Sequence, residues 1–351
     1  MSSKIGTNIE ISVFGESHGE AIGVVINNLP AGEKLDFAEL KSFMARRQGG
    51  NNPFSTPRKE ADEVKFLSGI SDGYITGAPL CAIIENNNTR SGDYNSDIPR
   101  PGHADFTAYV KYNGFNDYRG GGHFSGRLTA PLCIAGGILI QILARKGVKI
   151  LSHIYSIGNV YDTPFDMINP KIDAEDITFP VINQSVKAEM QNEILSAKDN
   201  LDSVGGIIEC AVTGVPSGNG DPIFSGIENK IASTVFGIGA VKGIEFGLGF
   251  KASSLRGSQV NDPFIIKDGE IKTETNNHGG ILGGISSGMP IIFRTAFKPT
   301  PSIGQEQRSV SLSKMEETTL KITGRHDPCI VPRAIPCIES AAAIAIADIL
   351  L

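Results

Sequence analysis

The chain has 351 residues, of which 40% are hydrophobic and 20% charged, and it is rich in turn-forming residues, with 41 glycines and 19 prolines. This composition is that of an ordinary folded protein, and the length fits one large domain or two smaller ones. The formal net charge of −6 argues against a nucleic-acid-binding domain, because such domains usually carry a basic excess.

The cysteines and the hydropathy pattern set two further limits. The five cysteines form no Cys-x-x-Cys pair, which favours reduced thiols in the cytoplasm over a disulfide framework or a zinc site. No run of about 18 uninterrupted apolar residues is present, so no membrane span is expected. Only fourteen residues precede the first glycine-framed motif, which leaves little room for a targeting peptide. We therefore expect a cytoplasmic protein.

The first third of the chain reads as short strands with one helix among them. The strands are predicted over 22–29, 63–67 and 80–85. Asp36 is expected to cap a helix that ends near Arg47. Residues 86–124 are rich in Asn, Gly and Asp and are expected to be mostly irregular. Residues 128–144 are apolar on nearly all sides, which predicts a helix that is buried all round.

Three segments of the second half echo segments of the first half in the same order. The matching pairs are 206–218 with 23–32, 287–293 with 76–82, and 333–338 with 127–134. We infer an internal duplication, with pseudo-repeats over about 1–150 and 200–351 inside a single domain that spans residues 1–351. The polar motifs of the two halves are then expected to converge near a pseudo-twofold axis.

Two apolar helices, 128–144 and 334–351, need cover on several sides. They predict an α+β fold in which a helical layer is sandwiched between antiparallel β-sheets. A doubly wound parallel sheet is not favoured, because no G-x-G-x-x-G follows a strand at a dinucleotide-binding position. No G-x-x-x-x-G-K-[ST] segment is present either.

Three glycine-framed segments carry three of the six histidines, and two of them also carry an aspartate. The segments are 15–19 with His18, 100–105 with His103, and 324–329 with His326 and Asp327. Beside glycines the backbone can approach a ligand closely, and histidine moves protons near neutral pH. We expect folding to assemble these segments into one active site. The structural alternatives are a turn histidine at residue 18 and a helix N-cap at residue 327.

His103 and Asp105 follow Arg100 closely. The His-x-Asp spacing would also suit a metal, but the remaining ligands are not evident, so no metal is expected. The better interpretation is a general acid beside a bound anion, in which Arg100 supplies the charge and His103 the proton for a leaving group.

Arginines gather in and beside the glycine-rich motifs. Guanidinium groups bind phosphate and carboxylate bidentately, so a small polyanionic ligand is expected. The loop 118–127 predicts an anion cradle at a helix N-terminus, formed by its amides with Ser125 and Arg127. Further ligand-binding loops are predicted over 46–59, 276–286 and 298–302.

Taken together, the motifs resemble those of chorismate synthase, in order and over nearly the whole chain. They are Gly-Glu-Ser-His-Gly (15–19), Arg-Pro-Gly-His-Ala-Asp (100–105), Arg-Gly-Gly-Gly (119–122), Asn-Asn-His-Gly-Gly-Ile-Leu-Gly-Gly-Ile-Ser (276–286) and Gly-Arg-His-Asp-Pro-Cys (324–329). The resemblance implies a lyase that removes phosphate from 5-enolpyruvylshikimate 3-phosphate by an anti 1,4-elimination. The product is chorismate, the shikimate-pathway precursor of the aromatic amino acids. The resemblance also implies a flavoprotein that needs reduced FMN although the reaction has no net redox change.

The resemblance implies roles for individual residues. His18 matches the histidine near the flavin N1/C2 carbonyl, His103 the acid that assists phosphate departure, and Asp327 the base that acts through flavin N5. The positions that match substrate-binding residues are Arg47, Arg58, Arg100, Ser125, Arg127 and Arg325. The positions that match flavin-binding segments are Phe124, Ser125, Gly239, Ala240, Gly283, Gly284, Lys298, Pro299, Thr300, Pro301, Ser302 and Arg325.

The chain departs from the family pattern in places. After the triple glycine, His123 and Phe124 stand where an arginine and a serine are common, and Gln48 interrupts an arginine run. Members of the family form homotetramers, so a homotetramer is expected here as well. Some members reduce their own flavin with NADPH and others need an external flavin reductase. No inserted segment marks the first type in this chain.

Two other functions are considered beside the lyase. A metal-dependent phosphohydrolase would use His103, Asp105, His326 and Asp327, and would need a divalent metal and water. A non-catalytic protein that binds anionic metabolites would keep its ligand after His18→Ala and His103→Ala.

Overall fold

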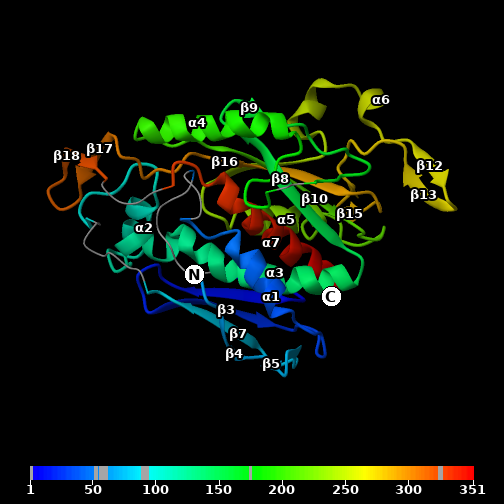
Figure 1. The fold of residues 1–351 in the computed structure, drawn as a ribbon, viewed down its shortest axis with the longest axis horizontal. Helices are drawn as coiled ribbons and strands as arrows, with labels where there is room; N and C mark the ends of the chain where they lie inside the picture. The colour runs from blue at the N-terminus through cyan, green and yellow to red at the C-terminus, as the bar shows by residue number, and fades with distance from the viewer. Residues whose placement is uncertain (1–2, 51–53, 55–61, 88–94, 174–175, 323–326) are drawn as a thin grey trace.

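The computed structural model describes residues 3–50, 54, 62–87, 95–173, 176–322 and 327–351. Two five-stranded antiparallel sheets dominate it (Figure 1). The first sheet has the order β1 (Lys4–Ile5), β2 (Glu10–Gly15), β3 (Ala21–Asn27), β7 (Leu80–Glu85) and β4 (Lys65–Ser68). The second has the order β11 (Val241–Phe246), β16 (Ile291–Phe297), β10 (Gly206–Thr213), β8 (Lys149–Ile157) and β9 (Val160–Tyr161).

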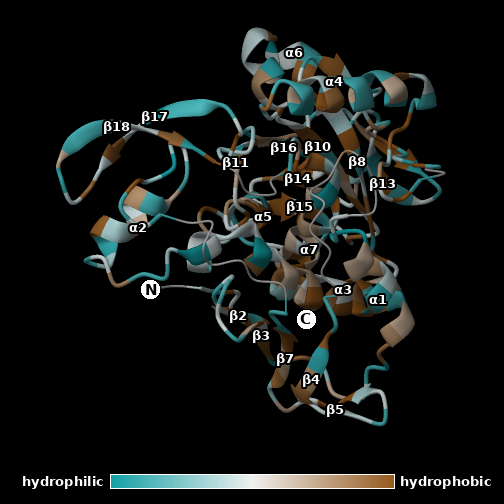
Figure 2. Cartoon of the chain, turned by 60° about the vertical axis from the view of Figure 1, so that its left-hand side comes forward, coloured by the Kyte–Doolittle hydropathy of each residue, from teal (hydrophilic) through white to brown (hydrophobic). Residues whose placement is uncertain are grey.

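Helices lie between the two sheets. The long helices α3 (Thr129–Arg145) and α7 (Val331–Leu350) pack against each other. On its other side α3 contacts β3 and β7, whereas α7 contacts β8 and β10. Figure 2 shows that these helices and the strands beside them are predominantly hydrophobic. Burial of this apolar surface is the main driving force that holds the layers together.

One helical stretch among the described residues is long and apolar enough to cross a membrane. It is Gly126–Arg145, which comprises α3 and the short turn before it, and 72% of its apolar window is buried inside the protein. The core position of α3 between a sheet and α7 therefore accounts for its apolar composition.

Smaller elements surround the two sheets and the long helices. The other helices are α1 (Phe37–Ala45), α2 (Asp105–Lys111), α4 (Lys187–Asp199), α5 (Ile227–Val235) and α6 (Gly257–Val260). Short 3-10 segments are Arg119–Phe124, Gly126–Leu128, Gln184–Val186 and Gly249–Ser254. Two-stranded hairpins are β5 (Ile70–Ser71) with β6 (Tyr74–Ile75), β12 (Phe264–Lys267) with β13 (Glu270–Thr273), β14 (Ile281–Leu282) with β15 (Ile285–Ser286), and β17 (Glu306–Ser311) with β18 (Glu316–Lys321).

Buried carboxylates fix α7 to the first half of the chain. Glu339 of α7 accepts two hydrogen bonds from Arg46, at 2.6 and 2.8 Å, and one from Ser152 of β8. Near the end of α7, Asp348 accepts backbone N–H groups of residues 7, 8 and 9. The last helix is therefore tied to α1, to β8 and to the segment before β2, so that the N-terminal ends of α3 and α7 are held side by side.

Some of the predictions made from the sequence for these elements are confirmed, and others are not. Antiparallel sheets mixed with helices confirm the α+β class, and the predicted helices 128–144 and 334–351 correspond to α3 and α7. Asp36 caps α1 by accepting the N–H groups of Ala38 and Glu39. The described part of 86–124 is mostly irregular, as expected, but it also contains α2, a seven-residue helix that was not predicted. Asp327 is not the N-cap of α7, because Ile330 occupies that position.

Candidate active site

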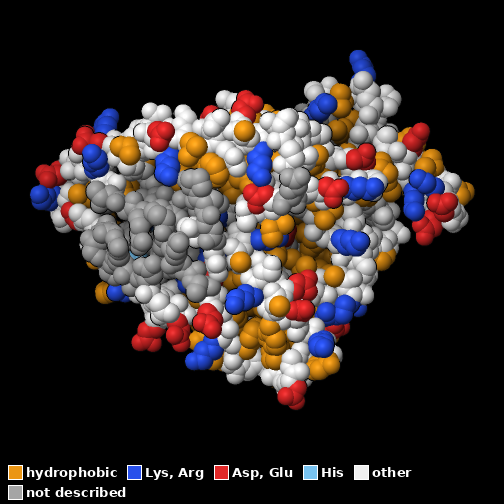
Figure 3. All heavy atoms as spheres, viewed as in Figure 1, with side chains coloured by type: hydrophobic (Ala, Val, Ile, Leu, Met, Phe, Trp, Pro, Cys, Tyr) orange, Lys and Arg blue, Asp and Glu red, His pale blue; other side chains and the backbone are white. Residues whose placement is uncertain are grey.

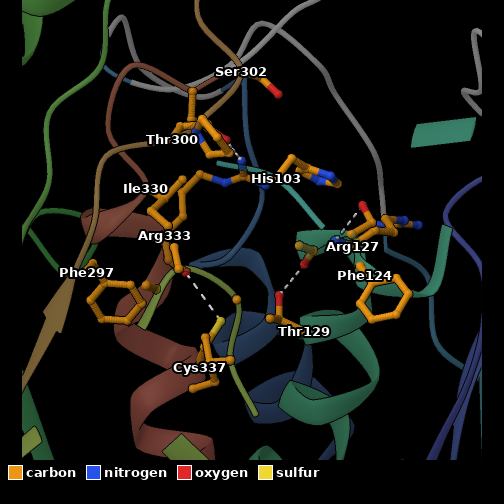
Figure 4. Close-up of a pocket in the computed structure, with 18 of the residues that line it drawn as sticks. His103, Phe124, Arg127, Thr129, Phe297, Thr300, Ser302, Ile330, Arg333 and Cys337 are labelled. Atoms are coloured by element: carbon orange, nitrogen blue, oxygen red, sulfur yellow. Dashed lines mark hydrogen bonds and ion pairs between the residues drawn. The ribbon is translucent and has the colours of Figure 1, made fainter. Parts of the chain in front are cut away.

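A cavity of about 590 Å³ opens at the N-terminal ends of α3 and α7. Thr129 of α3 and Cys337 of α7 line it, together with loops from both halves of the chain. Figure 4 shows side chains from these distant segments turned toward one space. Ligand pockets of this size, about 300 to 1,000 Å³, take a small molecule or a cofactor.

The triple glycine brings two of the motif histidines to one loop. Gly120, Gly121 and Gly122 have φ angles of 62°, 84° and 54°, in the left-handed region that favours glycine. A Cβ on Gly120 would lie 2.6 Å from the His18 ring, and one on Gly121 would lie 3.0 Å from the His103 ring. The glycines are therefore required for both imidazoles to approach the same backbone.

His103 is oriented by its neighbours in the same motif. Its Nδ1 lies 2.6 Å from Asp105 Oδ1, and Asp105 also accepts two side-chain hydrogen bonds from Arg100, at 2.7 and 2.8 Å. Burial would raise the pKa of Asp105, but the hydrogen bonds from Arg100 and His103 outweigh it and hold the pKa well below its usual range. An ionised Asp105 at Nδ1 leaves Nε2 of His103, a residue of the cavity lining, as the nitrogen available for proton transfer.

Two arginines of the cavity share one buried carboxylate. Asp62 accepts from Arg47 at 2.6 Å and also pairs with Arg127. Burial would raise the pKa of Asp62, but these two guanidinium groups lower it. Burial would likewise lower the pKa of Arg47, yet the attraction of Asp62 raises it. All three groups are therefore charged, and Asp62 holds the two guanidinium planes beside each other at the cavity wall.

Asp327 stands at the start of α7 and pairs with Arg333, one turn into the helix. Arg333 also donates from Nε to the carbonyl oxygen of Arg47 at 2.8 Å. Asp327, the predicted base, is thus held at the cavity by Arg333, which belongs to the same half of the chain. Arg333 also contacts the first half of the chain.

Cations and hydroxyls gather on the loop after β16. Lys298 donates to the carbonyl oxygen of Gly102 at 2.8 Å, and Arg100 donates to Ser302 Oγ at 3.3 Å. Burial and repulsion from Lys242 lower the pKa of Lys298. Thr300 Oγ1 is buried and has no hydrogen-bond partner among the described residues. A buried hydroxyl without a partner beside two ammonium groups fits an anionic ligand that would complete the site.

Apolar groups complete another part of the cavity wall. The Phe124 side chain is 43% exposed although it lines the cavity, and Phe297 and Ile330 lie across from it (Figure 4). An exposed aromatic ring and aliphatic groups provide a surface on which a flat ring can stack.

Most of the residues predicted to form the site are brought together. Those that line the cavity are His103, Asp327, Arg47, Arg100, Ser125, Arg127, Phe124, Gly239, Ala240, Lys298, Thr300, Pro301 and Ser302. His18 does not belong to the described lining of the cavity. Its ring lies next to Gly120, and Gly120 does line the cavity. Arg58 and Arg325 lie outside the described residues.

Three of the predicted flavin-binding positions are not brought into this cavity. Pro299 is absent from the described lining although its neighbours on both sides are present. Gly283 and Gly284 lie in the turn between β14 and β15, where Gly284 accepts the N–H of Ile227 at 2.9 Å. Within the described part of this single chain, that turn belongs to a different surface.

Sequence reasoning missed four groups at the cavity. Asp62, Lys242, Arg333 and Cys337 all line it, and none was assigned a role. For Arg333 a signal existed, since the echo between 333–338 and 127–134 pairs it with Arg127. No motif marks Asp62 or Lys242, whose positions follow from tertiary packing alone. Among the described residues, no group of three or more His, Cys, Asp or Glu side chains is arranged to hold a metal ion.

Comparisons with known proteins agree with one another. The sequence model of the family described as chorismate synthase matches residues 9–351. A chorismate synthase from Lancefieldella parvula is 48% identical over 367 residues, covering 100% of this chain and 96% of that protein. One from Thermococcus kodakarensis is 49% identical, covering 99% of this chain and 97% of that protein.

A solved structure gives the same result at the level of the fold. The crystal structure, described as that of chorismate synthase, matches with a TM-score of 0.74 and 27% identity, covering 99% of this chain and 93% of that chain. The family match over nearly the whole length, and full-length relatives at almost half identity, show that the chain belongs to the chorismate synthase family.

Proposed function

We propose that the cavity at the N-terminal ends of α3 and α7 is the active site in which this chain carries out the reaction of its family. That reaction is the anti 1,4-elimination of phosphate from 5-enolpyruvylshikimate 3-phosphate, which gives chorismate in the shikimate pathway. The observation that carries the proposal is His103, which is held at Nδ1 by Asp105 and lines a cavity together with six cationic side chains.

The charges of the cavity suit a polyanionic substrate. Its described lining contains six cationic side chains and only two carboxylates, Asp62 and Asp327. The substrate carries a phosphate and two carboxylates, so fixed guanidinium groups compensate its charge without reorganising. We assign substrate binding to Arg47, Arg100 and Arg127, with the hydroxyl of Ser125 beside them. Arg58 and Arg325 keep this assignment from the family pattern.

The lining residues also fit reduced FMN. Phe124, Phe297 and Ile330 offer apolar surface for a ring system, while Lys298, Thr300 and Ser302 offer donors for a phosphate. The unpartnered hydroxyl of Thr300 is the feature that such a phosphate would satisfy. When bound, the reduced cofactor supplies electron density that helps the phosphate leave. Gly239 and Ala240 would allow close approach of the ligand to the backbone.

The proton steps fall to the chain's own side chains. His103 in its doubly protonated form donates from Nε2 to the departing phosphate, and Asp105 stabilises the imidazolium at Nδ1. Asp327, held by Arg333, accepts the proton that the substrate ring loses. His18, behind Gly120, places a ring beside the glycine loop where it would face the cofactor.

Anaerobic turnover tests this proposal directly. The pure chain is incubated with 5-enolpyruvylshikimate 3-phosphate and dithionite-reduced FMN while chorismate absorbance and phosphate release are followed. We expect both products in equal amounts and neither with oxidised FMN. His103→Ala is expected to lower kcat by about 10²- to 10⁴-fold, the usual range for a general acid, with little change in KM.

Two matched variants make the test specific. Asp105→Asn keeps the size of the side chain but removes its charge, so it should lower kcat and move the alkaline limb of the pH–rate profile, where the general acid loses its proton, to lower pH. Lys111→Ala, at the exposed far end of α2, should leave both constants unchanged. Phosphate without chorismate would instead indicate a hydrolase, and ligand binding without any turnover would indicate a binding protein.

We also propose that the fold is a sandwich built by internal duplication. The duplicated sandwich is supported by the parallel roles of α3 and α7, which contact each other while α3 packs mainly on the first sheet and α7 on the second. It is further supported by the contact between Cys133 and Cys337, which occupy matching places in the two echoing segments. On this basis we retain one domain over residues 1–351, with repeats at about 1–150 and 200–351.

Assembly and the supply of reduced cofactor are proposed from exposed apolar side chains and from the family pattern. A homotetramer is supported by exposed apolar side chains on the protruding β12–β13 hairpin (Figure 3), where Phe264, Ile266 and Ile271 are 69%, 83% and 72% exposed. An external flavin reductase, or reduction of bound flavin by NADPH, follows from the family resemblance. A cytoplasmic location follows from the cysteine pattern.

A further inference from the structure

Two thiols meet at the base of the cavity, and the elimination uses neither. Cys337 of α7 lines the cavity, and its sulfur lies 3.8 Å from that of Cys133 on α3. In Figure 4 Cys337 comes from the first turns of α7, below Arg333. Both side chains are buried, and both are free thiols.

The surroundings of Cys337 favour its thiolate. Cys133 donates an S–H hydrogen bond to Cys337, and Arg47 and Arg333 supply positive charge nearby. The hydrogen bond from Cys133 is the largest effect, and with these cations it overcomes burial and lowers the pKa of Cys337 to about 7. The thiolate is the reactive form of cysteine, and reactive cysteines are found in such electropositive places.

The helices allow the two sulfurs to bond. One turn further along, α3 and α7 come so close that a Cβ on Gly136 would lie 2.4 Å from Ser340 Cα. Cys133 and Cys337 stand three residues before this closest contact on their respective helices. A disulfide needs an S–S distance of about 2.05 Å, which side-chain rotation and a small helix adjustment can provide from here.

We propose that Cys337 is a peroxide-reactive thiol at the base of the active cavity and that Cys133 resolves its oxidised form as a Cys133–Cys337 disulfide. In the first step the Cys337 thiolate attacks one oxygen of hydrogen peroxide, an S–O bond forms, the O–O bond breaks and hydroxide leaves. The sulfur is oxidised by two electrons to a sulfenic acid, and the peroxide is reduced.

In the second step the sulfur of Cys133 attacks the sulfenic sulfur of Cys337. The S–S bond forms, the S–O bond breaks, and the proton of Cys133 leaves with the oxygen as water. Burial and the hydrogen bond to Cys337 raise the pKa of Cys133 well above its usual value. Oxidation of Cys337 removes the negative partner of that hydrogen bond, so Cys133 becomes the better nucleophile only after the first step.

Peptide mass spectrometry of the full chain tests the proposal. The reduced protein is exposed to hydrogen peroxide, quenched at intervals, and its free thiols are alkylated. We expect a peptide pair that links Cys133 to Cys337 and is released by dithiothreitol. In Cys133→Ser, a dimedone adduct on Cys337 is expected instead, whereas in Cys337→Ser the Cys133 thiol should stay reduced.

Two other cysteines of the same chain serve as internal controls. Cys81 is more exposed than Cys337, so exposure alone predicts that Cys81 reacts first. The cationic surroundings of Cys337 predict the reverse order, with Cys337 oxidised first at pH 7. Cys329, whose pKa burial raises to about 12, should stay reduced. Faster oxidation of Cys81, or a wild-type chain in which Cys337 remains reduced, would overturn the proposal.

A second reagent pair probes the cationic setting without any oxidation. Anionic iodoacetate is expected to alkylate Cys337 faster than neutral iodoacetamide, because Arg47 and Arg333 attract the carboxylate. At Cys81, iodoacetamide should be the faster reagent. The same reagent preference at both cysteines would contradict a nucleophilic thiol held among cations.

Discussion

The imidazole of His153 shows how a single buried residue couples the second sheet to pH. Its Nδ1 lies 3.1 Å from Asp162 and its Nε2 lies 2.9 Å from Glu209, and all three side chains are fully buried. Burial would lower the pKa of His153, but the hydrogen bonds to Asp162 and Glu209 outweigh it and raise the pKa. Both ring nitrogens therefore carry protons in the folded protein.

The raised pKa of His153 predicts a loss of stability in the alkaline direction. The unfolded chain releases this proton near pH 6.5, while the folded chain keeps it to higher pH, so the stabilisation is complete below that value. It is lost as the pH rises through the folded pKa, by up to about 1.4 kcal/mol per pH unit. Urea unfolding from pH 6 to pH 9 should show this slope in wild type and not in His153→Gln. Equal slopes in both proteins would refute the assignment.

For single residues, the sequence predicts which side chains carry the chemistry better than it predicts which residues they contact. The motifs predicted His103, Asp105 and Arg100 because their glycine and proline neighbours mark a ligand-binding loop. His153 lies in an apolar run, and its buried contacts indicate a structural role. Asp62 was missed because its partners Arg47 and Arg127 lie 15 and 65 residues away, a proximity that no local pattern encodes.

Among the elements, α3 and α7 depend on one small residue at their contact. A Cβ on Gly136 would meet the Cα and Cβ of Ser340 at 2.4 and 2.2 Å, so the helices would have to separate. Gly136→Ala gains about 1 kcal/mol of helix propensity, yet we expect net destabilisation of about 2 kcal/mol from overpacking. A lower urea midpoint at unchanged slope would report this effect.

The neighbouring glycine of α3 provides the matched control. At Gly137 the nearest atom to an added Cβ is Leu40 Cδ1 at 2.6 Å, the end of a flexible side chain that can move aside. Gly137→Ala should therefore change the free energy of unfolding by less than about 1 kcal/mol. If both variants were equally stable, close approach of the helices at Gly136 would not be what limits their packing.

Element prediction from the sequence succeeded where the hydrophobic pattern was long. α3 and α7 were predicted within a few residues because an all-apolar run of this length has few alternatives to a buried helix. α2 was missed because its seven residues bury only Ala108, which leaves no period to detect. The pairing order β1-β2-β3-β7-β4 could not be predicted from the sequence either, because β7 pairs with β3, which is not its neighbour in the chain.

For the whole molecule, the cavity is the place where the two halves of the chain meet. Arg100, His103 and Arg127 come from the first half, whereas Lys298, Asp327 and Arg333 come from the second. Arg333 already bridges them by donating to the carbonyl oxygen of Arg47, and Asp348 binds the backbone of residues 7 to 9. A ligand that contacts both sets of side chains therefore stabilises both halves together.

This arrangement predicts how the protein unfolds with and without ligand. If residues 1–351 form one cooperative domain, calorimetry should show a single transition, with a van't Hoff enthalpy equal to the calorimetric one. A mixture of 5-enolpyruvylshikimate 3-phosphate and FMN at 100 times their dissociation constants should move that whole transition upward, by about 2.7 kcal/mol for each site filled. Asp105→Asn, which leaves the contacts between the halves in place, should keep one transition. Two transitions, of which the ligands move only one, would mean that the pseudo-repeats fold separately and that the cavity belongs to one of them.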